Sequence, residues 1–402
     1  MRKGENAMGF VMLFSLFVIL FSYGLVCWHE KSFVHYLTPT VSLLIVGSYI
    51  LPWAYMNIFG PFGSLYAYFY YYAAQSIAVL TSAIVYCYIR APRLGWKPDR
   101  VPVRRMHWAF LLLSVLVFLP ILIKYSSLLS NPREIYQETR SGGGIYYFTS
   151  SFFLDLAFAF FLFTKNRKFI SSLLFIAAVV LFSLLHGSKG QLLSFFWFWI
   201  IYTIYVEHKR FSLRKTLATL SFPIILICTL FIFFQGASLG NPFISMVQYS
   251  DYPRNAMLVI DDKSLEYKYG LSTIETNIYS RIPRAMFPLK PKRFGPFKLA
   301  SNYFSEGDWE DIGSPDFSIG LQYYDFGPFA VFYLMVWSAI TTFLLKGVIE
   351  KSKEGASRAN YVLIAFFVVG GFIPIGVSYT LPEHVILAYL MALQGRIRVR
   401  LL

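Results

Sequence analysis

Residues 8–27 run MGFVMLFSLFVILFSYGLVC, twenty residues without a charged side chain. A stretch of this length and polarity is long enough to cross the hydrocarbon core of a bilayer as one helix. It is long for the apolar core of a signal peptide and lacks a clear small-residue cleavage site. We therefore expect it to be retained as a membrane-spanning helix.

Similar apolar runs recur along the 402 residues, of which 56% are hydrophobic and only 14% are charged. A soluble domain usually carries about 25% charged residues. The runs are continuously apolar, unlike the alternating strands of a membrane β-barrel. We expect an all-α, polytopic integral membrane protein with about 11–12 transmembrane helices. The segments lie near residues 8–27, 36–56, 66–89, 108–124, 147–164, 169–186, 191–206, 216–235, 326–346, 359–376 and 381–396.

One long polar segment, residues 236–325, interrupts this pattern. It predicts three parts: N-terminal spanning helices over 1–235, a large external loop over 236–325, and C-terminal spanning helices over 326–402. The segment holds 9 of the 36 Lys and Arg but 11 of the 21 Asp and Glu, which leaves the rest with 27 basic against 10 acidic residues. That excess lies mostly in short loops, as expected for cytoplasmic connections. The polar segment then faces the opposite, external side.

The charge pattern leaves the orientation of the N-terminus open. Eleven crossings with a cytoplasmic C-terminus place the N-terminus outside, whereas Arg2 and Lys3 favour the cytoplasm. The net charge of +15 does not predict a nucleic-acid partner, because the basic residues are divided among short loops between apolar runs. The three cysteines have no metal or redox spacing, and no carboxylates cluster at metal spacing, so we expect neither a metal ion nor a cofactor.

Two glycine-containing loops on the external side are candidate anion sites. Arg140 precedes three glycines, whose exposed N–H groups would let an anion meet a guanidinium and the backbone together. The alternative is a flexible hinge with a solvated arginine. In His186-Gly-Ser-Lys189-Gly, Lys189 could reach a phosphate and His186 could act as a base, given its ordinary pKa of about 6.5. The alternative is an interfacial turn with a snorkelling lysine.

The polar segment carries the densest set of cations. Residues 271–281 predict a helix that Pro283 ends, so Arg281 and Arg284 bracket the break and Lys290 follows. Glu275 precedes Arg281 by six residues, an offset of roughly 120° on a helix, so the two do not pair. Glu275 is then available for another role, or is an ordinary solvated carboxylate. Asp316 is a further candidate, and Asp155 lies within an apolar run, where an ionisable side chain marks either function or a structural hydrogen bond.

Four short motifs carry a resemblance to a known family: Arg140-Ser-Gly-Gly-Gly, Gly187-Ser-Lys-Gly, Arg281-Ile-Pro-Arg…Phe-Pro-Leu-Lys-Pro, and Ser314-Pro-Asp…Tyr-Tyr-Asp-Phe-Gly-Pro-Phe. In these motifs and in its layout, the chain resembles the lipid-linked oligosaccharide repeat-unit polymerases, the Wzy-type O-antigen polymerases of bacterial inner membranes, with a GT-C-like glycosyltransferase architecture. Lys189 departs from this pattern, since an arginine is expected there in many relatives.

The resemblance implies glycosyl transfer at the periplasmic face, from one undecaprenyl diphosphate to the non-reducing sugar of another lipid-linked unit. It implies membrane lipids and a Wzz-type chain-length regulator as partners, and no nucleic acid. The predicted diphosphate ligands are Arg140, Arg281 and Arg284, supported by Lys189 and Lys290, without a metal ion. The predicted base is Glu275, His186 or Asp316, in that order. A ligase acting on lipid A core, a flippase or transporter, and a scaffold without chemistry are the alternatives.

Overall fold

The computed structural model describes residues 2–92, 106–129, 132–139, 144–164, 169–187, 189–219, 221, 244, 247, 251–279, 282, 286–291, 293–305, 315–353 and 358–369. Within these ranges every regular element is helical, which confirms the all-α prediction. The elements are α1 (Arg2–Glu30), α2 (Thr38–Leu44), η1 (Ile45–Ile50), α3 (Leu51–Phe59), α4 (Leu65–Tyr88), α5 (Met106–Lys124), η2 (Ser126–Leu128), α6 (Pro132–Thr139), α7 (Gly144–Leu162), α8 (Phe169–Leu185), α9 (Lys189–Tyr205), α12 (Asp251–Asp261), α13 (Leu271–Tyr279), α14 (Pro296–Tyr303), α16 (Gly320–Phe326), η3 (Gly327–Phe329), α17 (Ala330–Lys353) and α18 (Arg358–Val369).

Five helical stretches in the described part of the chain are long and apolar enough to cross a membrane: Asn6–Glu30, Thr38–Phe59, Met106–Lys124, Gly144–Leu162 and Gly320–Lys353. Helix α4, with 24 residues, has the length to do so as well, about 36 Å. The chain is therefore a polytopic membrane protein, as predicted. The predicted segment 381–396 and most of 216–235 lie outside the described residues.

The outward face of the spanning helices is apolar. On α1, the side chains of Phe10, Phe14 and Phe17 are each 60% exposed or more. In water such a surface would be costly, but lipid tails solvate it. The two serines of the same helix, Ser15 and Ser22, are buried instead. Helix α1 therefore turns these serines toward the protein and its phenylalanines toward lipid.

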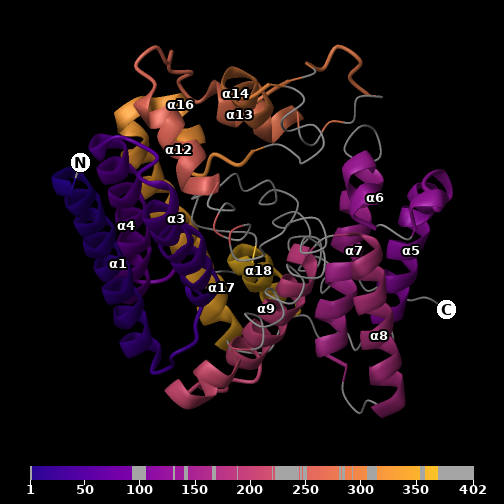
Figure 1. The fold of residues 1–402 in the computed structure, drawn as a ribbon. Helices are drawn as coiled ribbons and strands as arrows, with labels where there is room; N and C mark the ends of the chain where they lie inside the picture. Colours follow the sequence, from indigo (N-terminus) through magenta and orange to yellow (C-terminus); the bar gives the residue numbers. More distant parts are fainter. Residues whose placement is uncertain are drawn as a thin grey trace.

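Buried hydroxyl groups join the helices inside the membrane. Ser15 Oγ lies 2.7 Å from the hydroxyl of Tyr49 and donates to the carbonyl of Tyr72 at 2.9 Å. These contacts connect α1 with η1 and α4, and α4 also packs against α17 (Figure 1). Hydrogen bonds between helices suit a bilayer, where no water competes for the same groups.

A proline explains a further hydrogen bond between these helices. Pro52 lacks the N–H group that would normally bond to the carbonyl of Ser48, four residues earlier. The hydroxyl of Tyr72 donates to that carbonyl at 2.7 Å instead. The irregular turn η1 and the start of α3 therefore leave no unsatisfied carbonyl at this position, and helix α4 supplies the missing donor.

The two ends of the bundle differ in charge. At the inner end, defined by residues 28–37, 89–92, 206–215 and 346–353, Lys353 lies 3.7 Å from Glu30, and Lys346 donates to the carbonyl of Ile89 at 2.6 Å. The backbone N–H of Phe33 donates to Phe211 at 3.0 Å. The predicted cytoplasmic loops that are described thus converge on one end, which supports assigning them to one side of the membrane.

The outer end carries the polar segment. Helices α12, α13, α14 and α16 lie together at the top of Figure 1, beside the N-terminal ends of α1 and α4. Helix α1 runs parallel to α4, because Ser15 contacts Tyr72 near the outer end and Glu30 contacts Tyr86 near the inner end. The start of α1 therefore lies on the same side as the polar segment. Eleven crossings would require this arrangement, but the number of crossings and the side of the membrane that this end faces stay predictions.

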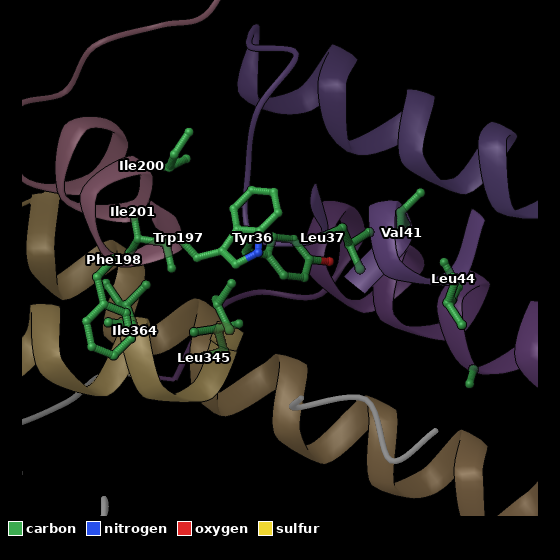
Figure 2. Packing of buried hydrophobic residues seen from close by; sticks show 14 of the residues in the cluster. Tyr36, Leu37, Val41, Leu44, Trp197, Phe198, Ile200, Ile201, Leu345 and Ile364 are labelled. Carbon is green, nitrogen blue, oxygen red and sulfur yellow. The ribbon is translucent and has the colours of Figure 1, made fainter. Parts of the chain in front are cut away.

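A buried core joins the inner parts of α9, α17 and α18. Figure 2 shows Tyr36 and Leu37, from the connection before α2, among Trp197 of α9, Leu345 of α17 and Ile364 of α18. The tyrosine-rich start of α4 is also mostly interior. Its Tyr68, Tyr71 and Tyr72 are fully buried and form core contacts, while Tyr66 and Phe69 are exposed.

Candidate functional site

Helix α13, which carries Glu275, is held at its first turn by a carboxylate from another helix. Asp325 of α16 accepts hydrogen bonds from the backbone N–H of Ser272 at 3.0 Å and of Thr273 at 2.8 Å. The hydroxyl of Thr273 donates to the same carboxylate at 2.5 Å. The first N–H groups of a helix have no partner within it, so Asp325 satisfies them from outside and interacts favourably with the helix dipole.

The segment before α13 lies close against α16 and η3. The N–H of Tyr269 donates to the carbonyl of Asp325 at 2.7 Å. Gly270, at φ +87°, leaves 3.2 Å between the place of a Cβ atom and the ring of Phe326. A Cβ atom on Gly327 would come within 2.6 Å of the ring of Tyr267. Two glycines thus permit the close approach that brings Asp325 to the start of α13.

Other acidic residues of the polar segment have partners of similar kinds. Asp261 accepts from the N–H of Ser64 at 2.7 Å and from its hydroxyl, and Ser64 in turn caps the start of α4. Asp262 accepts from the hydroxyl of Tyr303 at 2.8 Å and from the hydroxyl of Ser264 at 2.6 Å. These bonds hold the pKa of Asp262 below its ordinary value. Ion pairs complete the set: Asp251 with Arg254 at 3.7 Å and Glu266 with Lys268 at 3.3 Å.

Asp316, a predicted alternative base, caps the turn that leads into α16. Its carboxylate accepts from the N–H of Ser318 at 2.7 Å, and its backbone carbonyl accepts from the side chain of Asn255 at 3.1 Å. The surrounding protein raises the pKa of Asp316 by desolvation, and the Ser318 bond opposes this rise. The side chain still reaches solvent, so proton exchange is open to it. Its geometry nevertheless explains it as a turn residue.

Glu275 differs from these carboxylates. It lies half-buried in the middle of α13. Within the part of the chain that the structure describes, it has no hydrogen-bond or ion-pair partner, while the six other described acidic residues of segment 236–325 each have one. Its charge acts electrostatically on Tyr324 and Asp325. Glu275 is thus a carboxylate fixed by its helix and not used by the fold.

Lys290 belongs to the predicted cation cluster, and its side chain lies within the described residues. Its ammonium group donates to the carbonyl of Ile282 at 3.1 Å and lies 5.0 Å from the centre of the Phe294 ring. Ile282 stands between Arg281 and Arg284 in the sequence. The rings of Tyr279 and Phe287 stack at 6.2 Å, which joins the end of α13 to the same loop. The described part of this loop is therefore closed on itself beside the end of α13.

Four of the predicted diphosphate ligands cannot be placed in detail. Arg140, Arg281 and Arg284 lie outside the described residues. The backbone of Lys189 forms the first residue of α9, at the outer end of the bundle, and its side chain is outside the described part. The predicted site therefore rests on Glu275, Lys290 and the chain positions of these cations, and it stays a prediction.

His186, the second predicted base, is enclosed between α5, α7 and α8. Its Nδ1 lies 2.8 Å from the carbonyl of Phe182, and its Nε2 lies 2.9 Å from the hydroxyl of Ser150. Its ring stacks on Phe118 at 4.1 Å between centres. Both nitrogens have partners and the side chain is fully buried. The arrangement gives His186 a role in helix packing and does not favour it as a base.

Asp155 of α7 is a buried carboxylate whose Oδ1 has no hydrogen-bond partner. Gln191 of α9 donates to the carbonyl of Ser151, one turn before Asp155 on α7, at 3.1 Å. The contact fits the structural alternative weighed for Asp155, a polar link between α7 and α9. In the described ranges, no three His, Cys, Asp or Glu side chains lie close enough together to hold a metal ion.

Relatives with known names match almost the whole chain. O-antigen polymerases of Salmonella typhimurium and of Salmonella typhi are each 29% identical to it over 381 residues, which cover 94% of this chain and 92% of each relative. The chain is a homologue of the O-antigen polymerases. This confirms the resemblance seen in the sequence motifs, and it does not favour the ligase or flippase alternatives. No family model and no solved structure matches the chain.

Sequence reasoning missed the role of Asp325 in this O-antigen polymerase homologue. The motif around it, Tyr323-Tyr-Asp325-Phe-Gly-Pro, stood out, but no function followed from it. A partial signal was present, because the residues Ser272-Thr273 open α13 without a capping side chain of their own just before them. Only the folded chain shows that the missing cap comes from Asp325, more than fifty residues later.

Proposed function

We propose that this protein is a glycosyltransferase that polymerises oligosaccharide repeat units linked to undecaprenyl diphosphate. It takes the glycan from one lipid diphosphate and joins it to the non-reducing sugar of another lipid-linked unit. Homology to O-antigen polymerases over nearly the full length supports the reaction class. The substrate is accordingly a lipid-linked oligosaccharide.

The reaction has two electrostatic requirements. The bond between the anomeric carbon and the diphosphate oxygen breaks, and a bond from an acceptor hydroxyl oxygen to that carbon forms. The diphosphate leaves with an additional negative charge, which Arg140, Arg281 and Arg284 are suited to stabilise, with Lys189 and Lys290 in support. The hydroxyl proton must pass to a base. Arginines and a carboxylate can meet both requirements through this chain's own residues.

The lack of a partner for Glu275 among the described residues is the observation that carries the assignment of the base. The other described carboxylates of the polar segment accept bonds that the fold requires, so protonating them would weaken a cap or turn. Glu275 can accept a proton without such a loss. Its helix ends next to the loop that contains Ile282 and Lys290, and Arg281 and Arg284 flank Ile282 in the sequence. Base and predicted diphosphate ligands thus belong to one short stretch of chain.

The proposed location is the bacterial inner membrane, with the active site facing the periplasm. The cation-rich loops at the inner end support this orientation, since cytoplasmic loops carry an excess of Lys and Arg. The polar segment lies at the opposite end of the bundle. On the strength of the family resemblance, a Wzz-type regulator of chain length is the expected protein partner at that face.

Purified lipid-linked repeat units provide the test. The protein is incubated with them in detergent, with a metal chelator and without nucleotide sugar, and glycan length is measured on a gel. The expected result is a ladder for the wild type and its loss in Arg281→Ala and Arg284→Ala. Lys298→Ala serves as a matched control, because Lys298 is an exposed cation on α14 in the same polar segment.

The other outcomes are distinguishable. Units that stay single while moving onto lipid A core would show a ligase, and units that only change bilayer leaflet would show a flippase. Either result would overturn the proposal. Full activity of both arginine variants would agree with a polymerase but would show that Arg281 and Arg284 are not the diphosphate ligands. A wild-type ladder that forms without chelator and is lost when chelator is added would show that a metal ion takes part.

A further inference from the structure

Helix α13 is amphipathic, but its faces are reversed compared with those of a helix in water. Its buried face is polar: Ser272 is 3% exposed and Thr276 is 0% exposed. Its outer face is apolar, with Leu271 59%, Ile274 53% and Ile278 48% exposed. The spacing of three and four residues places these three side chains in one stripe. A helix in water normally turns such a stripe inward.

The apolar surface continues into the loop after the helix. Met286 is 78% exposed and Leu289 is 86% exposed, although both belong to the segment that bears the cations. Met286 follows Arg284 by two residues, and Leu289 directly precedes Lys290. The five exposed side chains, which we term the α13 apolar surface, are therefore interleaved in sequence with the predicted diphosphate ligands. They are Leu271, Ile274, Ile278, Met286 and Leu289.

The place of α13 in the molecule suits contact with lipid. Its first turn is fixed by Asp325, which lies within the long apolar run Gly320–Lys353 near the outer end of a spanning helix. The start of α13 therefore lies next to the first residues of a helical stretch that is apolar enough to cross the membrane. An apolar stripe at that level can meet hydrocarbon, whereas the same stripe farther from the membrane would meet only water.

We propose that the α13 apolar surface binds the isoprenoid chain of the lipid-linked substrate, next to the diphosphate. The inference rests on the proposed function, because it assumes an isoprenoid diphosphate as the donor. In that molecule the first isoprene unit is bonded directly to the diphosphate. A protein surface that binds both parts needs hydrocarbon contacts beside cations. Residues 281–293 provide that combination within one loop.

Charge distinguishes this occupant from the general bilayer. Membrane-surface helices also carry cations, but on the polar face opposite their apolar residues. Here the exposed Leu289 and the cation Lys290 are neighbours in one loop. In the chain, the apolar stripe of the helix is followed by a loop in which the exposed Met286 and Leu289 accompany the cations Lys290 and Arg293. The surface thus changes from purely apolar to mixed in one direction, as does a lipid diphosphate from its tail to its head.

The test compares donors with long and short isoprenoid chains. Repeat units are supplied on undecaprenyl diphosphate or on a diphosphate with two isoprene units, in detergent, and the rate of ladder formation is measured. The variant combines Leu271→Gln, Ile274→Gln and Ile278→Gln, because glutamine retains helix propensity. The matched control is Leu258→Gln on α12, where Leu258 is 43% exposed in the same polar segment.

The wild type and the control are expected to prefer the long chain. The triple variant should lose about tenfold in kcat/KM on the long-chain donor and little on the short one, so that the preference collapses. Arg281→Ala should instead lose activity on both donors. A triple variant that keeps the wild-type ratio between the two donors would overturn the proposal, whatever its absolute rate.

A photoreactive probe covers the case in which the triple variant is inactive on both donors. An isoprenoid diphosphate with a photoreactive group in its chain is crosslinked to the wild-type protein, and labelled peptides are mapped by mass spectrometry. Labelling of residues 271–289 supports the site, even if the wild type forms no polymer and the proposed function fails. Labelling elsewhere overturns the site. So does labelling of α13 only by a phospholipid with a photoreactive acyl chain, which would show bilayer anchoring.

Discussion

The inner and outer ends of the helix bundle use glutamate in different ways. At the inner end the side chain of Glu30 is 13% exposed, accepts a hydrogen bond from the hydroxyl of Tyr86 and lies 3.7 Å from Lys353. At the outer end Glu275 is half-buried and has no such partner among the described residues. One glutamate thus serves the fold at the inner end, whereas the other has no such role at the outer end.

This difference shows how a functional carboxylate can be separated from structural ones. Exposure alone does not do so, since Asp316 also reaches solvent while it caps a turn. The useful criterion is whether the charge already serves the fold. At the outer end, Asp325 serves it by holding α13, and Glu275 is held on that helix. One carboxylate is used to position another, which is typical of a site built in two layers.

The most direct test of this comparison replaces each of the two glutamates separately with a neutral residue. Glu275→Gln removes the proposed base while keeping the shape of the side chain. Loss of a general base typically lowers the rate about 10²-fold or more. Stability should change by less than about 0.5 kcal/mol, because no described contact is lost. Ladder formation from lipid-linked repeat units and the thermal midpoint in detergent measure the two effects.

Glu30→Gln is the counterpart at the inner end. It keeps an acceptor for Tyr86 but removes the charge facing Lys353, so we expect a lower thermal midpoint and a polymerisation rate close to that of the wild type. The comparison would fail if Glu275→Gln kept its full rate, or if Glu30→Gln reduced the rate as much as Glu275→Gln. In either case carboxylate partners would not distinguish the two ends.

A smaller effect is expected from the residue that positions α13. Asp325→Ala leaves the N–H groups of Ser272 and Thr273 without an acceptor, and loss of a helix cap costs about 1–2 kcal/mol. The rate should fall about tenfold, since Glu275 and the following cations would no longer be fixed, and a misplaced catalytic group loses rate steeply. Thermal midpoint and ladder formation are measured on the same preparations.

Asp262→Ala is the matched control for that variant. Asp262 also accepts bonds from N–H and hydroxyl groups in the polar segment, but its partners, Ser264 and Tyr303, are not on α13. We expect a similar or smaller loss of stability without the loss of rate. Equal rates for the two variants would show that fixing α13 through Asp325 has no special importance for the reaction.

The sequence predicted much of this fold because bilayers impose a strong pattern. Long apolar runs predicted the spanning helices, and the helix containing Glu275 followed from residues 271–281. The contacts that define the site were beyond reach, because they join distant parts of the chain. Asp325 reaches the start of α13 because Gly270 and Gly327 allow the two segments to approach closely, and the sequence alone does not show this approach. His186 was proposed as a base from its type and place, whereas its two hydrogen bonds depend on helices α7 and α8 together.

The apolar face of α13 was missed for a related reason. Alternation of Leu271, Ile274 and Ile278 with polar residues predicts an amphipathic helix, but not which face turns inward. In a soluble protein the apolar face would be buried. Here the fold buries Ser272 and Thr276 against Gly295, where a Cβ atom would lie 1.8 Å from the Thr276 hydroxyl. A close backbone contact therefore decided the orientation, against the usual hydrophobic rule.

The smallest expected effect concerns acid and again separates the two ends. His35, in the inner connection before α2, is buried, and burial lowers its pKa to about 3. An unfolded chain binds a proton on histidine below pH of about 6.5. Between these values the unfolded state binds more protons, so His35 makes the protein less stable as pH falls from about 6.5 toward 3. Asp262 at the outer end loses its contribution only below its ordinary pKa, about 3.9.

Thermal midpoints at pH 7.5 and pH 5.0 therefore report on the inner end and not on Asp262. His35→Asn cannot titrate and keeps a polar group near Nδ1, which accepts from the N–H of Leu37 at 3.3 Å. The wild type should lose more stability between the two pH values than the variant, by on the order of 2 °C. An equal loss in both would mean that His35 is protonated without cost in the native protein. The inference that His35 is neutral in the folded protein would then be wrong, and so would the inner half of the contrast between the two ends.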